Sequence, residues 1–155
     1  MSQFSDVAFD GLYGATIMDH YRNPRHRDPL HSADMSVHEF NPFCGDEVTL
    51  RAQLDGKGRF ARISSQSQGC SIIQASASMM AEGMVGRSAE ELEELARLFR
   101  ELMQGREMSK ESQAKLSDLA ALQVVRQYPV RIKCALLPWT ALEEGLDELR
   151  RSRGN

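Results

Sequence analysis

The feature that most constrains the fold is a change of hydrophobic period at Cys70. Over residues 47–55, EVTLRAQLD, apolar and polar side chains alternate, which is the pattern of a half-buried strand. The DGKG stretch at 55–58 is typical of a hairpin turn and leads into a second strand, residues 59–68. From Ser71 onward, apolar residues recur every three or four positions, as in amphipathic helices. The sequence therefore predicts a small antiparallel sheet followed by helices.

The flanking segments extend this pattern into one α+β domain. Residues 12–24 predict a short amphipathic helix that ends at an Asn-Pro pair. Residues 36–41 predict a third strand, which makes a three-stranded antiparallel sheet packed against several helices. Residues 25–34 are expected to form a polar loop, and residues 106–115 an exposed connection or a fraying helix start. Because no repeat or Pro/Gly-rich linker divides the chain, we expect a single domain over its whole length.

Two helices begin with capping-box sequences. Ser71 and Gln74 form one such pair, which places Cys70 just before the first helical turn. The SAEE stretch repeats the device at Ser88, and this helix is expected to end at Gly105. Its predicted buried stripe consists of Leu92, Leu95, Ala96, Phe99 and Leu102.

The last helix is expected to begin at Pro129, after a helical stretch over residues 116–127. At 100° per residue, Cys134 lies to one side of the apolar stripe of this helix, so it is not obviously a core residue of that helix, and an end-of-core position is favoured. Pro138 cannot donate to the carbonyl of Cys134, which predicts a kink or a loosened turn. The stripe itself is Ile132, Leu136, Trp139, Leu142, Leu146 and Leu149.

Composition excludes several classes of function. A net charge of -3 and a pI near 5.8, with basic residues scattered along the chain, disfavour nucleic acid and anionic lipid as partners. No stretch approaches the roughly 18 apolar residues that a membrane span requires. The opening residues lack the basic and apolar regions of a signal peptide, so a cytoplasmic location is expected. Three widely separated cysteines do not suit a disulfide framework, which leaves thiolate chemistry or simple burial.

The cysteines and one acid form the candidate site. Cys44 lies in a predicted turn beside Gly45 and Asp46, an environment that disfavours simple burial. Cys70 precedes a helix N-terminus, which favours its thiolate. The alternatives are that the cysteines are small core residues and that Asp46 is a turn-forming side chain. Three thiolates and a carboxylate would suit tetrahedral zinc, and this reading gives Cys44, Asp46, Cys70 and Cys134 a common role.

Other candidate ligands have simpler explanations. The four histidines lack partners at ligand-like spacing, so they are expected on the surface or in loops. Met79, Met80 and Met84 have helical spacing and are expected in the core. Arg131 and Lys133 either offset the charge of a metal site or are solvated charges at a helix end.

Four stretches resemble, in order, the landmarks of the U-type (IscU/NifU N-terminal-like) iron–sulfur cluster assembly proteins. These stretches are DHYRNPRH, NPFCGDEV, GCSIIQASASMM and PVRIKCALLPW, and the resemblance covers nearly the whole chain. Lys133 stands where the scaffold branch of this family has a histidine, and a longer segment near residues 95–115 is similar to the insertion of SufU-like proteins. Both features favour the SufU-like branch.

The resemblance implies an IscU/SufU-like α+β domain and one zinc bound by Cys44, Asp46, Cys70 and Cys134. It implies a sulfurtransferase that accepts persulfide sulfur from a SUF-type, pyridoxal-phosphate-dependent cysteine desulfurase and passes it to a downstream iron–sulfur assembly scaffold. Cys44 would be the sulfur acceptor, released from the metal when a desulfurase histidine replaces it. Arg131 would assist docking or orient the attacking thiolate.

Two alternatives remain beside this reading. A cluster scaffold would use the same ligands to hold an iron–sulfur cluster. A binding module would carry a purely structural zinc, since a fully ligated zinc is normally structural.

Overall fold

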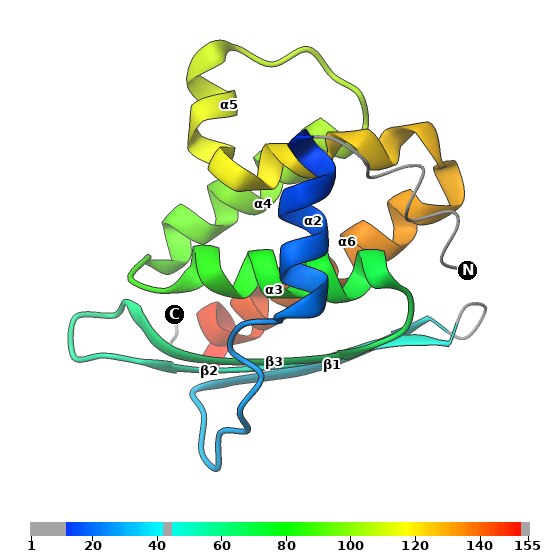
Figure 1. The fold of residues 1–155 in the computed structure, drawn as a ribbon. Helices are drawn as coiled ribbons and strands as arrows, with labels where there is room; N and C mark the ends of the chain where they lie inside the picture. Colours follow the sequence, from blue (N-terminus) through cyan, green and yellow to red (C-terminus); the bar gives the residue numbers. More distant parts are fainter. Residues whose placement is uncertain (1–11, 42–44, 153–155) are drawn as a thin grey trace.

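The computed structural model describes residues 12–41 and 45–152, and it confirms the predicted α+β fold (Figure 1). Three strands form an antiparallel sheet in the order β1-β2-β3, with β1 at Met35–Asn41, β2 at Asp46–Leu54 and β3 at Phe60–Gln68. The predicted meander and its hairpin are thereby confirmed.

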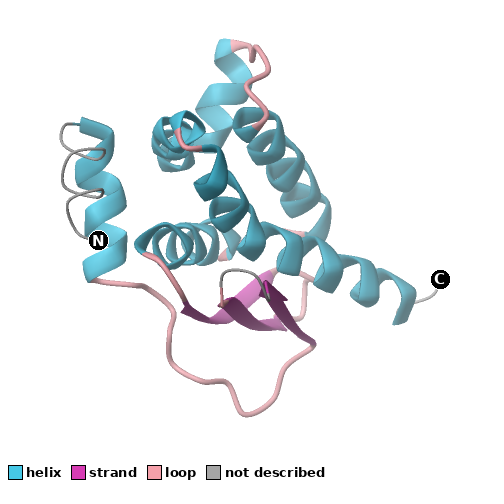
Figure 2. Ribbon diagram, turned by 90° about the vertical axis from the view of Figure 1, so that its right-hand side faces the viewer, coloured by secondary structure: helices cyan, strands magenta, loops and turns pink. Residues whose placement is uncertain are grey.

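The alternation predicted for the middle strand decides which face of the sheet is covered. Val48, Leu50 and Ala52 of β2 are fully buried. The residues between them point to the opposite face, because side chains alternate along a strand. Figure 2 shows the helices on one side of the strands and the loop of residues 23–34 on the other.

Six helical segments surround this core. In the described residues they are α2 (Leu12–Arg22), α3 (Ser71–Met84), α4 (Ala89–Met103), α5 (Lys110–Leu116), the 3-10 helix η1 (Ser117–Gln127) and α6 (Pro129–Ser152). Helix α3 packs on β3, and α6 packs on β1 and β2. Helix α2 packs on α3, and α4 packs on α6.

The predicted connection at 106–115 contains the start of α5, and the stretch 116–127 is mostly a 3-10 helix, which is tighter than an α-helix. No helix among these is both long enough and apolar enough to cross a bilayer.

The predicted polar loop is irregular, but it covers the outer face of the sheet. Its carbonyl groups accept hydrogen bonds from side chains of the strands: Arg51 donates to Leu30, and Gln66 donates to Arg27 at 3.0 Å. Leu30 is itself buried. Two polar side chains on this face thus hydrogen-bond to backbone carbonyl groups of the loop.

Helix α4 follows the sequence prediction closely. Ser88 and Glu91 form the capping box, with the amide of Glu91 donating to Ser88 Oγ at 3.2 Å and the amide of Ser88 donating to Glu91 Oε1 at 3.0 Å. Gly105 has a φ of +78°, the left-handed conformation that commonly ends a helix. All five residues of the predicted stripe are buried.

The capping box predicted at Ser71 and Gln74 is wrong. Cys70 occupies the N-cap position of α3 and Ser71 is the first helical residue. The Gln74 side chain instead donates to the carbonyl of Gly69 at 3.0 Å. The N-cap residue of α3 is therefore a cysteine and not a serine, and the amides of Ile72 and Ile73 lie next to its thiol.

Cys134 lies in the core, which its position beside the predicted stripe did not indicate. Cys134 is only 2% exposed, whereas Ile132 and Leu136 of the predicted stripe are partly exposed. The buried face of α6 passes through small residues as well as large ones: Cys134, Ala135, Pro138, Trp139, Ala141, Leu142, Gly145, Leu146 and Leu149. Small residues mark this face because the helix lies very close to the sheet at Gly145, where an added Cβ would come within 2.7 Å of Val37.

Candidate metal centre

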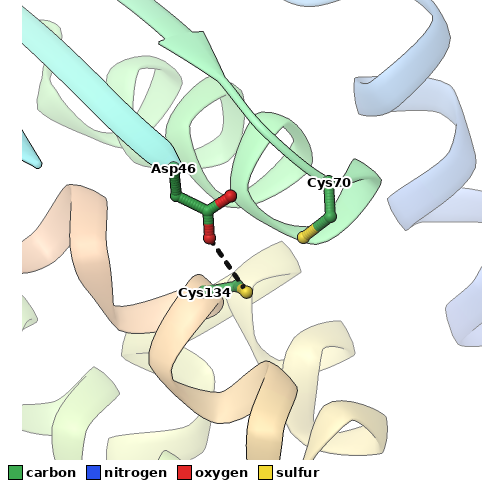
Figure 3. A group of neighbouring side chains, drawn as sticks. All are labelled: Asp46, Cys70 and Cys134. Carbon is green, nitrogen blue, oxygen red and sulfur yellow. Dashed lines mark hydrogen bonds between the residues drawn. The ribbon is translucent and has the colours of Figure 1, made fainter. Parts of the chain in front are cut away.

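Three of the four predicted ligands meet in space although 88 residues of sequence separate the first from the last. One ligand atom each of Asp46, Cys70 and Cys134 lies within 4.8 Å of the others, and Figure 3 shows the three side chains pointing toward one another. The part of the chain that the structure describes holds no other such group of His, Cys, Asp or Glu. Cys44 lies outside the described residues.

Each member of the group comes from the end of a different element. Asp46 begins β2 and is 3% exposed, Cys70 precedes α3 and is half-buried, and Cys134 lies in the second turn of α6. The sheet register fixes Asp46 opposite Asn41 of β1. A buried carboxylate in this position requires hydrogen-bond donors or a cation, because an unpaired buried charge is costly.

The two thiols have opposite pKa shifts. A hydrogen bond with Cys134 and the amides of Ile73 and Ile72 lower the pKa of Cys70 to about 6, although burial and the charge of Asp46 oppose this. The contact with Cys70, burial and Asp46 raise the pKa of Cys134. Cys134 also donates to Asp46 Oδ2 at 3.2 Å. These shifts favour the thiolate form of Cys70 over that of Cys134.

Arg131 lies against both thiols. Burial opposes its charge, but attraction to Cys70 and hydrogen bonds to Cys134 and Cys70 raise the pKa of the guanidinium above its usual value. Of the two cations considered in the sequence, Arg131 thus contacts the group, whereas Lys133 is exposed and has no such contact described.

The donor set fits a divalent metal such as zinc. Zinc binds thiolate sulfur at about 2.3 Å and carboxylate oxygen at about 2.0–2.2 Å in a tetrahedron, so neighbouring ligand atoms lie less than about 4 Å apart. The distance of 3.2 Å between Cys134 Sγ and Asp46 Oδ2 meets this requirement. All three ligand atoms lie within 4.8 Å of one another, so the group would have to contract only slightly to bind zinc. Three ligands leave a fourth position for a further donor.

Ser76 is a structural contributor that the sequence reasoning missed. Its hydroxyl is fully buried, donates to the carbonyl of Ala135 at 2.7 Å and accepts from Trp139 Nε1 at 3.2 Å. Ser76 therefore ties α3, which follows Cys70, to the turn of α6 that carries Cys134. A serine within the apolar ASASMM stretch is a weak sequence signal for such a bridge.

The remaining side chains considered as ligands have other roles. His20 is 7% exposed, which corrects the expectation that all four histidines lie at the surface or in loops, and its Nδ1 hydrogen-bonds to Ser78 Oγ at 2.8 Å. Met79, Met80 and Met84 are buried in the core as expected.

The model of the NifU-like N-terminal domain family matches residues 12–135, and the chain belongs to that family. It is 42% identical over 141 residues to the zinc-dependent sulfurtransferase SufU of Bacillus subtilis, which covers 88% of this chain and 90% of the relative. It is 37% identical to the iron–sulfur cluster assembly scaffold protein IscU of Streptococcus pyogenes, over 87% of this chain and 82% of the relative.

A solved structure gives the same result. A putative iron–sulfur cluster assembly scaffold protein for the SUF system from Fervidobacterium islandicum superposes with a TM-score of 0.77 and 32% identity, covering 84% of this chain and 93% of that one. The resemblance noted in the sequence is therefore confirmed at the level of family and fold.

Proposed function

We propose that this protein is a zinc-dependent sulfur acceptor that takes persulfide sulfur from a cysteine desulfurase and passes it into iron–sulfur cluster assembly. The observation that carries the proposal is the convergence of Asp46, Cys70 and Cys134 from three elements, with Arg131 against both thiols. The similarity to the SufU sulfurtransferase supports it. We place this activity in the cytoplasm, with no membrane or nucleic-acid partner.

In this proposal Cys44, Asp46, Cys70 and Cys134 hold one zinc per chain. Cys44 is two residues from Asp46 in the sequence, and it is the proposed fourth ligand. When bound, zinc keeps its thiolate ligands deprotonated at neutral pH and undergoes no redox chemistry itself. The four ligands carry four negative charges, of which the divalent ion cancels two and Arg131 a third. Cys134 must give up its proton when a metal binds, so affinity should fall as the pH falls.

Cys44 is the proposed catalytic residue, and its reaction is a thiol exchange. The Cys44 thiolate attacks the outer sulfur of the desulfurase persulfide. A bond from Cys44 to that sulfur forms as the bond to the desulfurase cysteine breaks, and the desulfurase sulfur leaves as a thiolate. The transferred sulfur keeps its oxidation state, so no further oxidant or reductant is needed. Cys44 then passes the sulfur to a downstream assembly scaffold.

Arg131 contributes charge and orientation. Its contacts with Cys70 and Cys134 hold these two sulfurs in place while Cys44 reacts. The neighbouring Val130 is 69% exposed, so this end of α6 presents an apolar and a cationic side chain together at the surface beside the group. Such a rim suits the docking of a partner that carries the persulfide.

The test is turnover of a SUF-type, pyridoxal-phosphate-dependent desulfurase on cysteine, with and without this protein at measured zinc content. Zinc-loaded wild type should stimulate turnover, and mass spectrometry should find one added sulfur on the Cys44 peptide. Cys44→Ser should abolish both effects. The control is Lys133→Ala, at an exposed position for which no contact with Asp46, Cys70 or Cys134 is described, and it should retain zinc binding and both effects. No stimulation by zinc-loaded wild type would overturn the proposal.

The second candidate is a cluster scaffold, which is favoured by the scaffold names of several relatives. It predicts charge-transfer absorption in the visible after anaerobic reconstitution with iron and sulfide, and transfer of an intact cluster to an apo acceptor. Both results, together with an absence of stimulated desulfurase turnover, would replace the sulfurtransferase reading.

Metal removal separates a purely structural zinc from a functional one. A ligand at 1,000 times its Kd stabilises the folded state by about 4 kcal/mol, so chelation should lower the Tm clearly. Cys134 belongs to the core and Cys70 packs against it, but most core residues lie outside the group, so the metal-free chain should still unfold cooperatively. A chain that loses all structure on chelation, combined with normal turnover stimulation by Cys44→Ser, would establish a structural zinc.

A further inference from the structure

Gly69 joins β3 to α3 immediately before Cys70, and it stands beside the metal group without belonging to it. The last paired residues of β2 and β3 are Glu47 and Gln68, so one further step along the ladder places Gly69 opposite Asp46. Gly69 has a φ of +138°, which L side chains rarely adopt, and this conformation turns the chain out of the sheet and into the helix.

The space next to Gly69 is filled by the Asp46 carboxylate. A Cβ added at Gly69 would overlap Asp46 Oδ1, and it would lie 2.9 Å from Asp46 Cγ and 3.0 Å from Ile73 Cγ2. The other oxygen, Oδ2, accepts from Cys134. The carboxylate is therefore held between a glycine on one side and a thiol on the other.

Neither neighbour can move aside easily. Asp46 is 3% exposed at the start of the central strand, and Ile73 is fully buried in the core. A carboxylate pushed away from residue 69 would have to change its position relative to Cys70 and Cys134, since these two sulfurs are the other members of the group.

We propose that Gly69 is a positioning residue of the metal centre, because its missing side chain is what allows the Asp46 carboxylate to lie in ligand distance of Cys70 and Cys134. The inference rests on the ligand set of the proposed function and adds a residue that sets metal affinity without touching the metal. The role differs from that of an ordinary turn glycine. Gly58, Gly86 and Gly105 also have positive φ values, but a Cβ at any of them would meet nothing within 4 Å.

This contrast supplies a matched control. Gly69→Ala introduces both backbone strain and the overlap with Asp46, whereas Gly86→Ala, at the opposite end of α3, introduces backbone strain alone. Zinc affinity measured by competition with a chromogenic chelator should fall about 10-fold or more in Gly69→Ala, as is typical when support for a metal ligand is lost. It should remain close to wild type in Gly86→Ala. With Co²⁺ as a spectroscopic probe, Gly69→Ala should shift the visible bands toward those of Asp46→Ala.

A double variant shows whether Gly69 acts through Asp46. In an Asp46→Ala background, where the carboxylate is gone, Gly69→Ala should cause no further loss of zinc affinity. If Gly69→Ala is strongly destabilised, Asp46→Ala/Gly69→Ala should be more stable than Gly69→Ala, because the overlap with the carboxylate is relieved while the backbone strain remains. Wild-type affinity in Gly69→Ala, an equal loss in the Asp46→Ala background, or a double variant no more stable than Gly69→Ala would each overturn the inference.

The outcomes also separate this inference from the function on which it rests. A wild-type chain that binds no zinc would overturn both. A wild type that binds zinc and stimulates the desulfurase, with Gly69→Ala binding equally well, would overturn only the role of Gly69.

Discussion

The two halves of α6 are packed for different purposes. The first half, up to Pro138, carries Cys134 into the candidate metal group, and its larger apolar side chains, such as Val130 and Ile132, stay partly or largely exposed. The second half buries Leu142, Leu146 and Leu149 against the sheet and α4. One helix thus carries chemistry at one end and stability at the other. We therefore expect mutations in the first half of α6 to change reactivity and mutations in the second half to change stability.

The largest expected effect lies where α4 packs on the second half of α6, which begins at Trp139. Phe99 of α4 is fully buried and stacks on Trp139, with ring centroids 4.7 Å apart. Phe99→Ala should reduce the free energy of unfolding by about 3–5 kcal/mol, measured by urea denaturation, because a large buried ring is replaced by a cavity. Phe99→Leu, which keeps most of the volume, should cost less. Zinc stoichiometry should be unchanged in the folded variant, and its loss would show that the two halves are coupled.

The next effect lies at the junction of the halves, where Ser76 ties α3 to α6. Ser76→Ala should cost about 1–3 kcal/mol in unfolding free energy, because it leaves the buried N–H of Trp139 without an acceptor. It should also weaken zinc binding, since the bridge holds the turn that carries Cys134. Trp139→Phe removes the donor that Ser76→Ala leaves without a partner. The double variant should therefore lose less unfolding free energy than the sum of the two single losses. Strict additivity would contradict the bridge.

A smaller effect is expected where α6 lies closest to the sheet. An added Cβ at Gly145 would be 2.7 Å from Met35 Sδ and Val37 Cγ2, whereas at Gly83 of α3 it would make an ordinary contact of 3.5 Å with Leu95. Both Gly→Ala changes gain up to about 1 kcal/mol of helix propensity. Gly83→Ala should therefore stabilise the protein, while overpacking should leave Gly145→Ala about 1 kcal/mol less stable than wild type. Equal changes in Tm for the two variants would mean that α6 and β1 are not tightly packed at Gly145.

The smallest effect is a pH dependence outside both halves. Burial, assisted by the charge of Arg25, lowers the pKa of His20 below that of an unfolded histidine. Between the folded value and about 6.5, the unfolded chain binds more protons, so this contribution to stability is present above that window and is lost as the pH falls through it. His20→Gln should flatten the slope of unfolding free energy against pH in that window. A variant with the wild-type slope would contradict the assignment.

The candidate site could be predicted in part from the sequence, because its members carry chemical signals and lie in stretches that resemble a known family. The residue types and flanking elements of Asp46, Cys70 and Cys134 predict them as metal ligands, and the fold brings their ligand atoms together. The position of Asp46 next to Gly69 could not be read in this way, since it depends on the register of β2 against β3. The same holds for Ser76, whose partners lie on another helix.

The sequence by itself determined the strands, the hairpin and the capped start of α4, because each follows from side chains a few residues apart. It also determined which residue types were available to bind a metal. Only the tertiary structure decided that Cys70 caps α3, that Cys134 is buried, and that small residues line the inner face of α6. These outcomes depend on how closely distant elements approach one another, and residue spacing along the chain carries no measure of that distance.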